Sequence, residues 1–165
     1  PEFVRAMAAR GDVALDVQGF VRVNDAGALV FRDWAEKRDM IPLIHYLKTD
    51  AAEAELLTGT SDRREAARML HEWGAREVVL THNTEVLACV DGAIYAAPFT
   101  PRNLSGRTGR GDTCFGSYCA WRRDHGPEEA CRFAAALTSL KMERPGPFSG
   151  TVAEVEAAIE ERYTP

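Results

Sequence analysis

The sequence contains no hydrophobic run near the roughly 18 residues that a membrane-spanning helix needs. It also has no excess of basic residues, because 20 Lys and Arg face 25 Asp and Glu, for a formal net charge of −5. Proteins that bind nucleic acid or anionic membranes usually carry the opposite charge. We therefore expect neither nucleic acid nor a membrane among its partners.

Paired cysteines are missing as well. The four cysteines form no CxxC pair, and no histidine lies near them at zinc-site spacing: Cys89, Cys114, Cys119 and Cys131. Reduced thiols are typical of such a pattern, and together with the lack of a signal-peptide pattern they predict a cytoplasmic protein. The sequence has no internal repeat and no low-complexity linker. Its 165 residues are enough for one domain, which we expect to span 1–165.

Short apolar strands alternate with amphipathic helices along the chain, which predicts an α/β fold with a sheet flanked by helices. Strands are expected at 13–17, 42–47 and 76–81, followed by a hairpin whose turn is Asp91-Gly92. Three pairs spaced as capping boxes mark helix starts: Asp50 with Glu53, Asp62 with Glu65, and Thr151 with Glu154. A longer helix is expected at 128–142. In such folds the ligand binds at the carboxyl ends of the strands.

The most informative stretch is Thr108-Gly109-Arg110-Gly111-Asp112-Thr113, which leads into a helical pattern. Glycines at a helix start let several backbone N–H groups converge, and the helix dipole adds positive potential, so an anion can bind there. A carboxylate beside such a site can accept a hydroxyl proton during phosphoryl transfer. The simpler alternative is a tight turn with Asp112 as N-cap.

This stretch, GRGDTCFGSY, resembles the GAGD signature of the ribokinase-like (PfkB) carbohydrate kinases. Asp16-Val17-Gln18-Gly19-Phe20 is similar to the family's D-x-x-G strand end, and the segment ending in Glu55-Leu56-Leu57-Thr58-Gly59 is similar to its N-x-x-E and ELLTG region. The resemblance implies a ribokinase-like, Rossmann-like sheet, with Asp112 as catalytic base and Gly109, Arg110, Gly111 and Asp112 as the anion hole. It covers nearly all of the chain but corresponds to the C-terminal, nucleotide-side half of the family fold, without the N-terminal half.

The same resemblance places a Mg²⁺ contact, through water, at Asp50 and Glu53. Asp50 stands where the family has asparagine. The alternative is that both residues only cap the helix, and the two roles are compatible.

For the nucleotide, the resemblance implies contacts from Thr81 and Asn83, although the two glycines that the family has in this turn are missing. Arg107 and Arg110 add cations beside the anion hole, or else both face solvent. The helix carrying Leu137 and Lys141 borders the adenine pocket in the family, and the loop that includes Phe148 lines it.

The resemblance therefore implies ATP-dependent and Mg²⁺-dependent phosphoryl transfer to a hydroxyl of a sugar or related polyol or nucleoside. The alternative is a nucleotide- or anion-binding fragment without turnover on its own. A third possibility is adhesion, because Arg10-Gly11-Asp12 and Arg110-Gly111-Asp112 both read RGD; an adhesion site, however, needs an exposed loop tip. We expect a small-molecule substrate, and self-association or pairing with a missing N-terminal half through an unpaired sheet edge.

Overall fold

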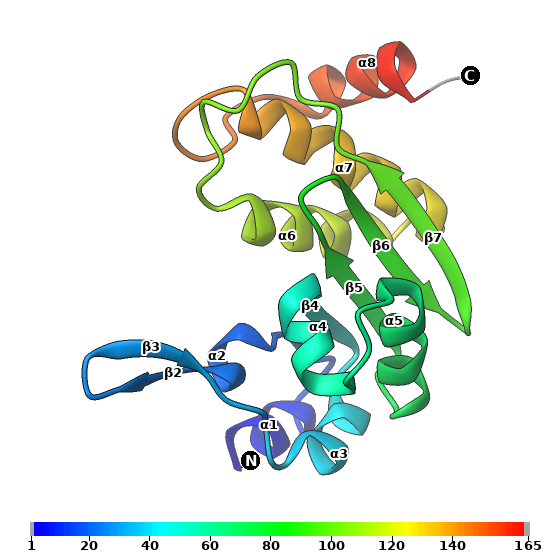
Figure 1. Ribbon diagram of the computed structural model, residues 1–165. Coiled ribbons are helices and arrows are strands. Elements are labelled where there is room, and N and C mark those ends of the chain that lie inside the picture. The colour runs from blue at the N-terminus through cyan, green and yellow to red at the C-terminus, as the bar shows by residue number, and fades with distance from the viewer. Residues whose placement is uncertain (1, 164–165) are drawn as a thin grey trace. The chain divides into compact units, whose positions relative to one another are not determined.

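The main sheet has five strands in the order β1-β4-β5-β6-β7 in a computed structural model that describes residues 2–163 (Figure 1). The strands are β1 (Ala14–Asp16), β4 (Tyr46–Asp50), β5 (Glu77–Thr81), β6 (Glu85–Val90) and β7 (Ala93–Pro98). β1 and β4 run parallel, with Leu15 opposite Leu47. With its flanking helices this is the predicted α/β fold.

β1, β5 and the hairpin of β6 and β7 form where the sequence predicted them. All five residues of β5 are buried, as expected for a strand that is covered on both faces. The predicted hairpin is confirmed, because β6 and β7 are neighbours joined by Asp91 and Gly92, whose φ angles are +50° and +77°. Two positive φ values in a two-residue loop match the twist of paired strands.

The chain divides into two compact units, each described by itself below. One comprises the residues up to Leu80 together with Ala88–Ile94, and the other comprises Thr81–Leu87 and the residues from Tyr95 onward. The helical elements of the first unit are α1 (Glu2–Ala8), α2 (Gln18–Val21), α3 (Lys37–Met40), η1 (Ile41–Leu43), α4 (Ala51–Thr58) and α5 (Arg63–Glu72). Those of the second are α6 (Arg110–Arg122), α7 (Pro127–Met142) and α8 (Val152–Arg162).

In the first unit, α4 and α5 begin at the predicted caps. Asp50 and Glu53 form a reciprocal capping box, and α4 ends at Gly59, whose φ is +82°. Asp62 caps α5 by accepting hydrogen bonds from the amides of Arg64 and Glu65. The box is not reciprocal there, because the Glu65 carboxylate accepts a hydrogen bond from the Thr60 hydroxyl instead.

Two features of the first unit differ from expectation. The predicted strand at 42–47 begins later, since residues 41–43 form a 3-10 turn and β4 starts at Tyr46. Pro42 has no amide hydrogen to give to a neighbouring strand, which explains the delay. A second, antiparallel sheet of β2 (Arg22–Asp25) and β3 (Ala28–Phe31) was expected only in part, at its turn and at 29–31.

The second unit is built around α7. Phe133 of α7 and Val155 of α8 belong to one buried cluster, and the Trp121 ring of α6 stacks on Phe133 with centroids 3.8 Å apart. The capping box of Thr151 and Glu154 is confirmed at the start of α8. The periodicity of α8 predicts that Val152, Val155 and Ile159 point inward, and this is wrong for Val152, which is 50% exposed in the first turn of the helix.

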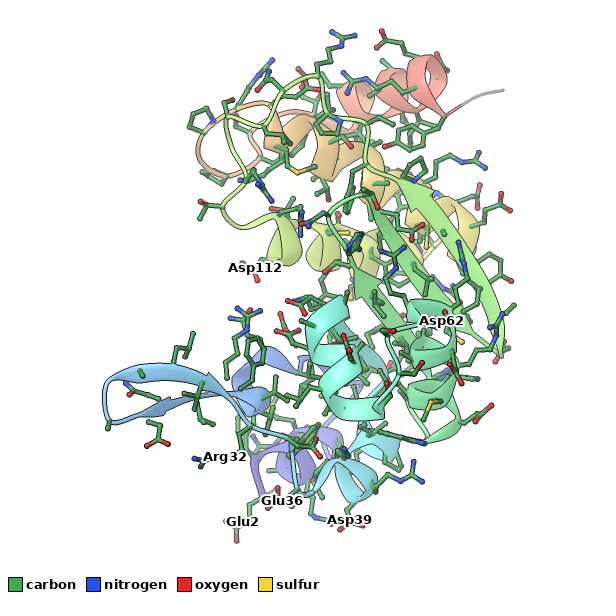
Figure 2. The ribbon with its side chains drawn as sticks, viewed as in Figure 1. Glu2, Arg32, Glu36, Asp39, Asp62 and Asp112 are labelled. Carbon is green, nitrogen blue, oxygen red and sulfur yellow. The ribbon has the colours of Figure 1, made fainter. Side chains whose placement is uncertain are left out.

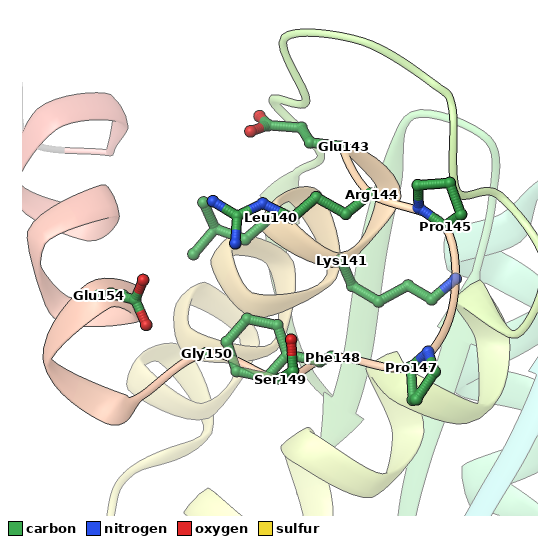
Figure 3. Close-up of a pocket in the computed structure, with 10 residues that line it drawn as sticks. All are labelled: Leu140, Lys141, Glu143, Arg144, Pro145, Pro147, Phe148, Ser149, Gly150 and Glu154. Atoms are coloured by element: carbon green, nitrogen blue, oxygen red, sulfur yellow. The ribbon is translucent and has the colours of Figure 1, made fainter.

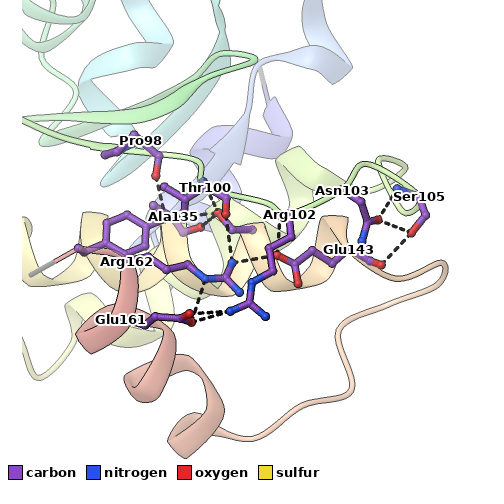
Figure 4. A network of polar contacts seen from close by, with 11 residues as sticks. Pro98, Thr100, Arg102, Asn103, Ser105, Ala135, Glu143, Glu161 and Arg162 are labelled. Atoms are coloured by element: carbon purple, nitrogen blue, oxygen red, sulfur yellow. Dashed lines mark hydrogen bonds and ion pairs between the residues drawn. The ribbon is translucent and has the colours of Figure 1, made fainter.

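A polar network joins α8 to the segment after β7 and to the end of α7 (Figure 4). The Arg162 guanidinium donates to the Glu143 carboxylate at 2.8 Å and to the Thr100 carbonyl at 3.1 Å. Arg102 donates its amide to Glu143 and its guanidinium to Glu161. Through Thr100 and Arg102, this network holds the start of the segment that connects β7 to α6.

Within residues 2–163, no helix is long and apolar enough to cross a membrane. The four cysteines are thiols that are not joined in disulfides in the described part of the chain.

Candidate functional site

The glycine-rich stretch forms the start of α6. Gly109 is the N-cap with a φ of +76°, a left-handed conformation that glycine adopts without a steric cost. The helix begins at Arg110, so Asp112 is its third residue. The alternative that Asp112 is the N-cap is therefore wrong.

Backbone donors are free at this helix start. The first intrahelical bond runs from the Thr113 amide to the Gly109 carbonyl, at 3.0 Å, and the Arg110 amide donates to the Arg107 carbonyl at 3.3 Å. Among the described residues, no acceptor faces the amides of Gly109, Gly111 and Asp112. Three of the four amides predicted for an anion hole are thus available, at the positive end of a 13-residue helix.

The Asp112 carboxylate lies in the first turn of α6 and is exposed (Figure 2). It has no hydrogen bond or ion pair to any residue in the described range. An unpartnered carboxylate next to free amides can accept a proton from a hydroxyl that is bound there.

Arg110 is held in place, unlike Arg107. Its guanidinium donates to the Asn83 side-chain oxygen at 3.1 Å and lies 5.9 Å from the centre of the Phe99 ring. Arg110 is half-buried, whereas Arg107 is exposed. The alternative that both arginines merely face solvent therefore applies to Arg107 and not to Arg110. The structure brings the predicted residues Asn83 and Arg110 together, and it adds Phe99, to which no sequence pattern pointed.

Lys141 of α7 is a buried cation beside the same loop. Only 4% of the residue is exposed, and its ammonium donates to the Gly106 carbonyl at 2.6 Å and also to the Thr108 carbonyl. No carboxylate within residues 2–163 pairs with it. Gly106 is required there, because a Cβ at this position would lie 1.8 Å from the Arg144 carbonyl oxygen. Lys141 therefore ties the segment that enters the anion hole to α7.

A pocket of about 130 Å³ opens beside Lys141 (Figure 3). The residues lining it are Leu140, Lys141, Glu143, Arg144, Pro145, Pro147, Phe148, Ser149, Gly150 and Glu154. Its volume lies below the roughly 300 Å³ at which ordinary small-molecule pockets begin. Hydrogen bonds from the Thr151 amide and hydroxyl lower the pKa of Glu154 at one side of the pocket. Lys141 and Phe148 both line this pocket, and their contact with a nucleotide stays a prediction.

Two other predicted nucleotide residues are not part of this pocket lining. Leu137 is partly buried and packs against the cluster of Phe133, Ala136 and Val155. Thr81 is buried at the end of β5. Their contact with a nucleotide stays a prediction.

The predicted metal residues lie in the first unit and are already engaged. Asp50 accepts the Glu53 amide on Oδ1 at 2.9 Å and the Arg22 guanidinium on Oδ2 at 2.8 Å. Glu53 accepts the Asp50 amide on Oε2 at 2.8 Å, and its Oε1 lies 3.0 Å from Arg22 Nη2. Burial raises the pKa of Glu53, while the Asp50 amide acts in the opposite direction.

These contacts limit what the carboxylates can offer to Mg²⁺. Three of the four carboxylate oxygens of Asp50 and Glu53 accept a hydrogen bond. The fourth, Glu53 Oε1, is buried and accepts none, although it lies 3.0 Å from Arg22 Nη2. No group of three or more His, Cys, Asp or Glu side chains within residues 2–163 is arranged to hold a metal. With three oxygens hydrogen-bonded and Arg22 beside the fourth, the pair as it stands does not fit direct ligation, and a contact with Mg²⁺ through water stays a prediction. Nothing in the sequence pointed to Arg22.

Comparison with known proteins adds a family and relatives. Residues 15–153 match the profile described as pfkB family carbohydrate kinase. A cytidine kinase from Thermococcus kodakarensis is 30% identical over 119 residues, which are 70% of this chain and 43% of that protein. The chain thus spans less than half of the length of this curated relative.

Two solved structures share the fold. A pyrophosphate-dependent kinase of the ribokinase family, complexed with a pyrophosphate analogue and myo-inositol, is 38% identical with a TM-score of 0.86. The match covers 94% of this chain and 57% of that one. Arabidopsis thaliana ribokinase, complexed with ribose and ATP, is 21% identical with a TM-score of 0.75, over 95% and 50% of the two chains. The second likeness supports the fold alone.

Proposed function

The chain belongs to the pfkB family of carbohydrate kinases, and we propose that it carries the catalytic base and anion hole of a kinase that phosphorylates a hydroxyl of a sugar, polyol or nucleoside. The observation that carries the proposal is the start of α6, where the unpartnered Asp112 carboxylate adjoins the free amides of Gly109 and Gly111. Charge that develops on a transferring phosphoryl group is stabilised by such preorganised donors.

In the proposed step, the acceptor hydroxyl oxygen attacks the terminal phosphorus of the donor while the bond from that phosphorus to the leaving oxygen breaks. Asp112 takes the hydroxyl proton. The amides of Gly109, Gly111 and Asp112, with the Arg110 guanidinium, hold the donor phosphates. Mg²⁺, when bound, would neutralise charge on the donor phosphates. Asp50 and Glu53, in the first unit, would hold a Mg²⁺ ion only through its water molecules.

We also propose that the chain corresponds to the C-terminal, nucleotide-side half of the family fold. This assignment rests on the order of its motifs and on its coverage of 43% of the cytidine kinase and 57% of the pyrophosphate-dependent kinase. The acceptor pocket would then lie mostly in the other half. By itself the chain could bind a nucleotide or another anion without turnover, and this stays as the alternative function.

ATP is the first candidate donor. Asn83, Arg107 and Arg110 would contact the phosphates of ATP. Lys141 and Phe148, which line the 130 Å³ pocket, would contact its nucleoside together with Thr81 and Leu137. A base could enter only if the loop of residues 143–150 moved outward, because the pocket is smaller than the roughly 300 Å³ that ordinary ligand pockets reach.

Pyrophosphate is a second candidate donor, favoured by the small pocket and by the buried, carboxylate-free ammonium of Lys141. A buried cation is costly without a counter-charge, and a second phosphate would supply one without a nucleoside. The 38% identical structure is described as a pyrophosphate-dependent kinase, which supports this candidate.

The test compares wild type with Asp112→Asn in a protein that includes the other half of the family fold, with ATP or pyrophosphate as donor. Asparagine keeps the size of the side chain but cannot accept the proton, so turnover should fall on the order of 10² to 10⁴-fold. Thermal stability should change little, because Asp112 makes no bond within the described residues. Near-normal turnover in the variant would refute the base assignment.

A further inference from the structure

Arg22 brings a cation to the two carboxylates that begin α4, although it lies 28 residues before Asp50. Its Nη2 atom lies 2.8 Å from Asp50 Oδ2 and 3.0 Å from Glu53 Oε1. The Nη2 atom donates a hydrogen bond to Asp50, whereas its contact with the buried Glu53 Oε1 is an ion pair without a hydrogen bond. The Glu53 side chain is fully buried, whereas those of Asp50 and Arg22 are 30% and 28% exposed.

We propose that Arg22 is the resident cation of the Asp50–Glu53 pair, and that the pair ligates no divalent metal directly while Arg22 is in place. The charges support this assignment. Two neighbouring carboxylates, one of them fully buried, repel each other unless a cation lies between them. The capping box uses Asp50 Oδ1 and Glu53 Oε2. A metal ion would have to displace the guanidinium from the other two oxygens, Asp50 Oδ2 and Glu53 Oε1.

The chain holds Arg22 in this position from its other side. Arg22 is the first residue of β2 and lies opposite Phe31 of β3 in the sheet register. Its guanidinium carbon lies 5.3 Å from the centre of the Phe31 ring, a distance typical of a cation–π contact. The hairpin of β2 and β3 therefore holds the Arg22 guanidinium in position.

Arg22 also accounts for Asp50 at a position where the resemblance expects asparagine. Asparagine would give the same N-cap without a charge. The additional negative charge of Asp50 is matched by the guanidinium at 2.8 Å. Asp50 and Arg22 together thus add no net charge next to the buried Glu53.

The consequence for catalysis rests on the proposed function: Mg²⁺ would reach this pair only through water. The inference about Arg22 itself is independent of turnover, because it concerns which cation the carboxylates bind. Its test therefore measures metal binding and not phosphoryl transfer, so that the two proposals can fail separately.

The experiment titrates the purified protein with Mn²⁺, as a probe for Mg²⁺, and follows the electron paramagnetic resonance signal of the free ion. Wild type and Asp50→Asn should bind Mn²⁺ equally. Arg22→Gln should gain one Mn²⁺ site whose affinity is about tenfold or more above any that wild type shows, because Asp50 Oδ2 and Glu53 Oε1 lose the cation beside them. The double variant with Asp50→Asn should lose that site.

Arg22→Lys keeps the positive charge and should resemble wild type. Arg32→Gln is the matched control, because Arg32 pairs with Asp25 at 3.4 Å on the exposed part of the same hairpin and should gain no site. Circular dichroism checks the folding of each variant.

Two results would overturn the proposal. One is a wild-type Mn²⁺ site that Asp50→Asn removes, and the other is a folded Arg22→Gln protein without a new site. The comparison of wild type with Asp50→Asn involves no change at Arg22, so it decides the matter even if Arg22→Gln does not fold.

Discussion

Lys141 is the residue whose position most needs a functional explanation. It is 4% exposed, and both of its described partners are backbone carbonyls, those of Gly106 and Thr108. Two neutral acceptors offset only part of the cost of burying an ammonium. The ammonium therefore contributes positive potential next to the amides at the start of α6, where the proposed donor phosphates would bind.

Lys141→Met should weaken anion binding and also make residues 106–109 more mobile. Methionine fills a similar space, but the Gly106 and Thr108 carbonyls lose their donor, which costs about 1–3 kcal/mol of stability for a buried group. We expect faster hydrogen exchange at residues 106–109 and weaker thermal protection by pyrophosphate or ATP. Arg144→Ala, an exposed cation at the same pocket, is the control and should change neither measurement. Unchanged exchange in Lys141→Met would contradict the proposed tether.

Arg110 gives a second prediction at this scale. Ligands that bind only the folded state raise its melting temperature by mass action. If Arg110 holds the donor phosphates, Arg110→Ala should reduce the protection given by ATP or pyrophosphate, with little change in the melting temperature without ligand. Arg123→Ala, at the exposed C-cap of α6, should keep full protection. Equal protection of wild type and Arg110→Ala in differential scanning fluorimetry would exclude Arg110 from the anion site.

At the scale of elements, the contact between α7 and α8 depends on Glu143. Burial alone would raise its pKa, but the Arg102 amide and the Arg162 guanidinium donate to the carboxylate and hold the pKa below its ordinary value of 4.5. The unfolded chain therefore takes up the proton at a higher pH than the folded chain. The stabilisation by Glu143 is complete above pH 4.5 and is lost as the pH falls through the lower folded value.

Glu143→Gln should consequently destabilise the protein more at neutral pH than in acid. The difference in the free energy of unfolding between variant and wild type should shrink between about pH 7 and about pH 3. Urea unfolding at both pH values measures it. Glu160→Gln, an exposed residue of α8, serves as control, and a difference that does not depend on pH would refute the assigned role of the carboxylate.

At the scale of the whole molecule, the sheet and the small hairpin both leave surfaces available for association. β1 is an edge strand of the five-stranded sheet, which agrees with the expectation of an open edge near Val13. Leu29 and Phe31 on β3 are 69% and 54% exposed, and Phe3 on α1 is 70% exposed. Unpaired edges and exposed apolar side chains favour contact with another chain.

We therefore expect this chain to self-associate in the micromolar range when it is purified by itself. Leu29→Lys should shift sedimentation toward the monomer, since it places a charge on the exposed part of the hairpin. Val152→Lys, at a residue of α8 that is 50% exposed, should have no such effect. Wild-type protein that sediments as a sharp monomer would count against this prediction.

The sequence by itself determined those features that depend on neighbours within a few residues. The capping boxes at Asp50 and Thr151 and the hairpin turn at Asp91 were predicted, because a short side chain or a missing Cβ acts on its own turn of backbone. The motif order likewise predicted the family that residues 15–153 match. The sequence left open whether Asp112 is the N-cap of this helix. Moving the helix start by three residues, from Asp112 to Gly109, leaves the pattern of apolar and polar residues almost unchanged.

Only the tertiary structure decided which distant groups meet. Arg22 contacts Asp50 across 28 residues, Arg110 binds Asn83 across 27, and Lys141 reaches Gly106 across 35. An arginine or a lysine looks the same in a sequence whether it faces solvent or a buried carboxylate. The partner of such a cation is determined only when strands pair and helices pack. Burial then makes an unpaired charge costly, so only the few arrangements that give the charge a partner are stable.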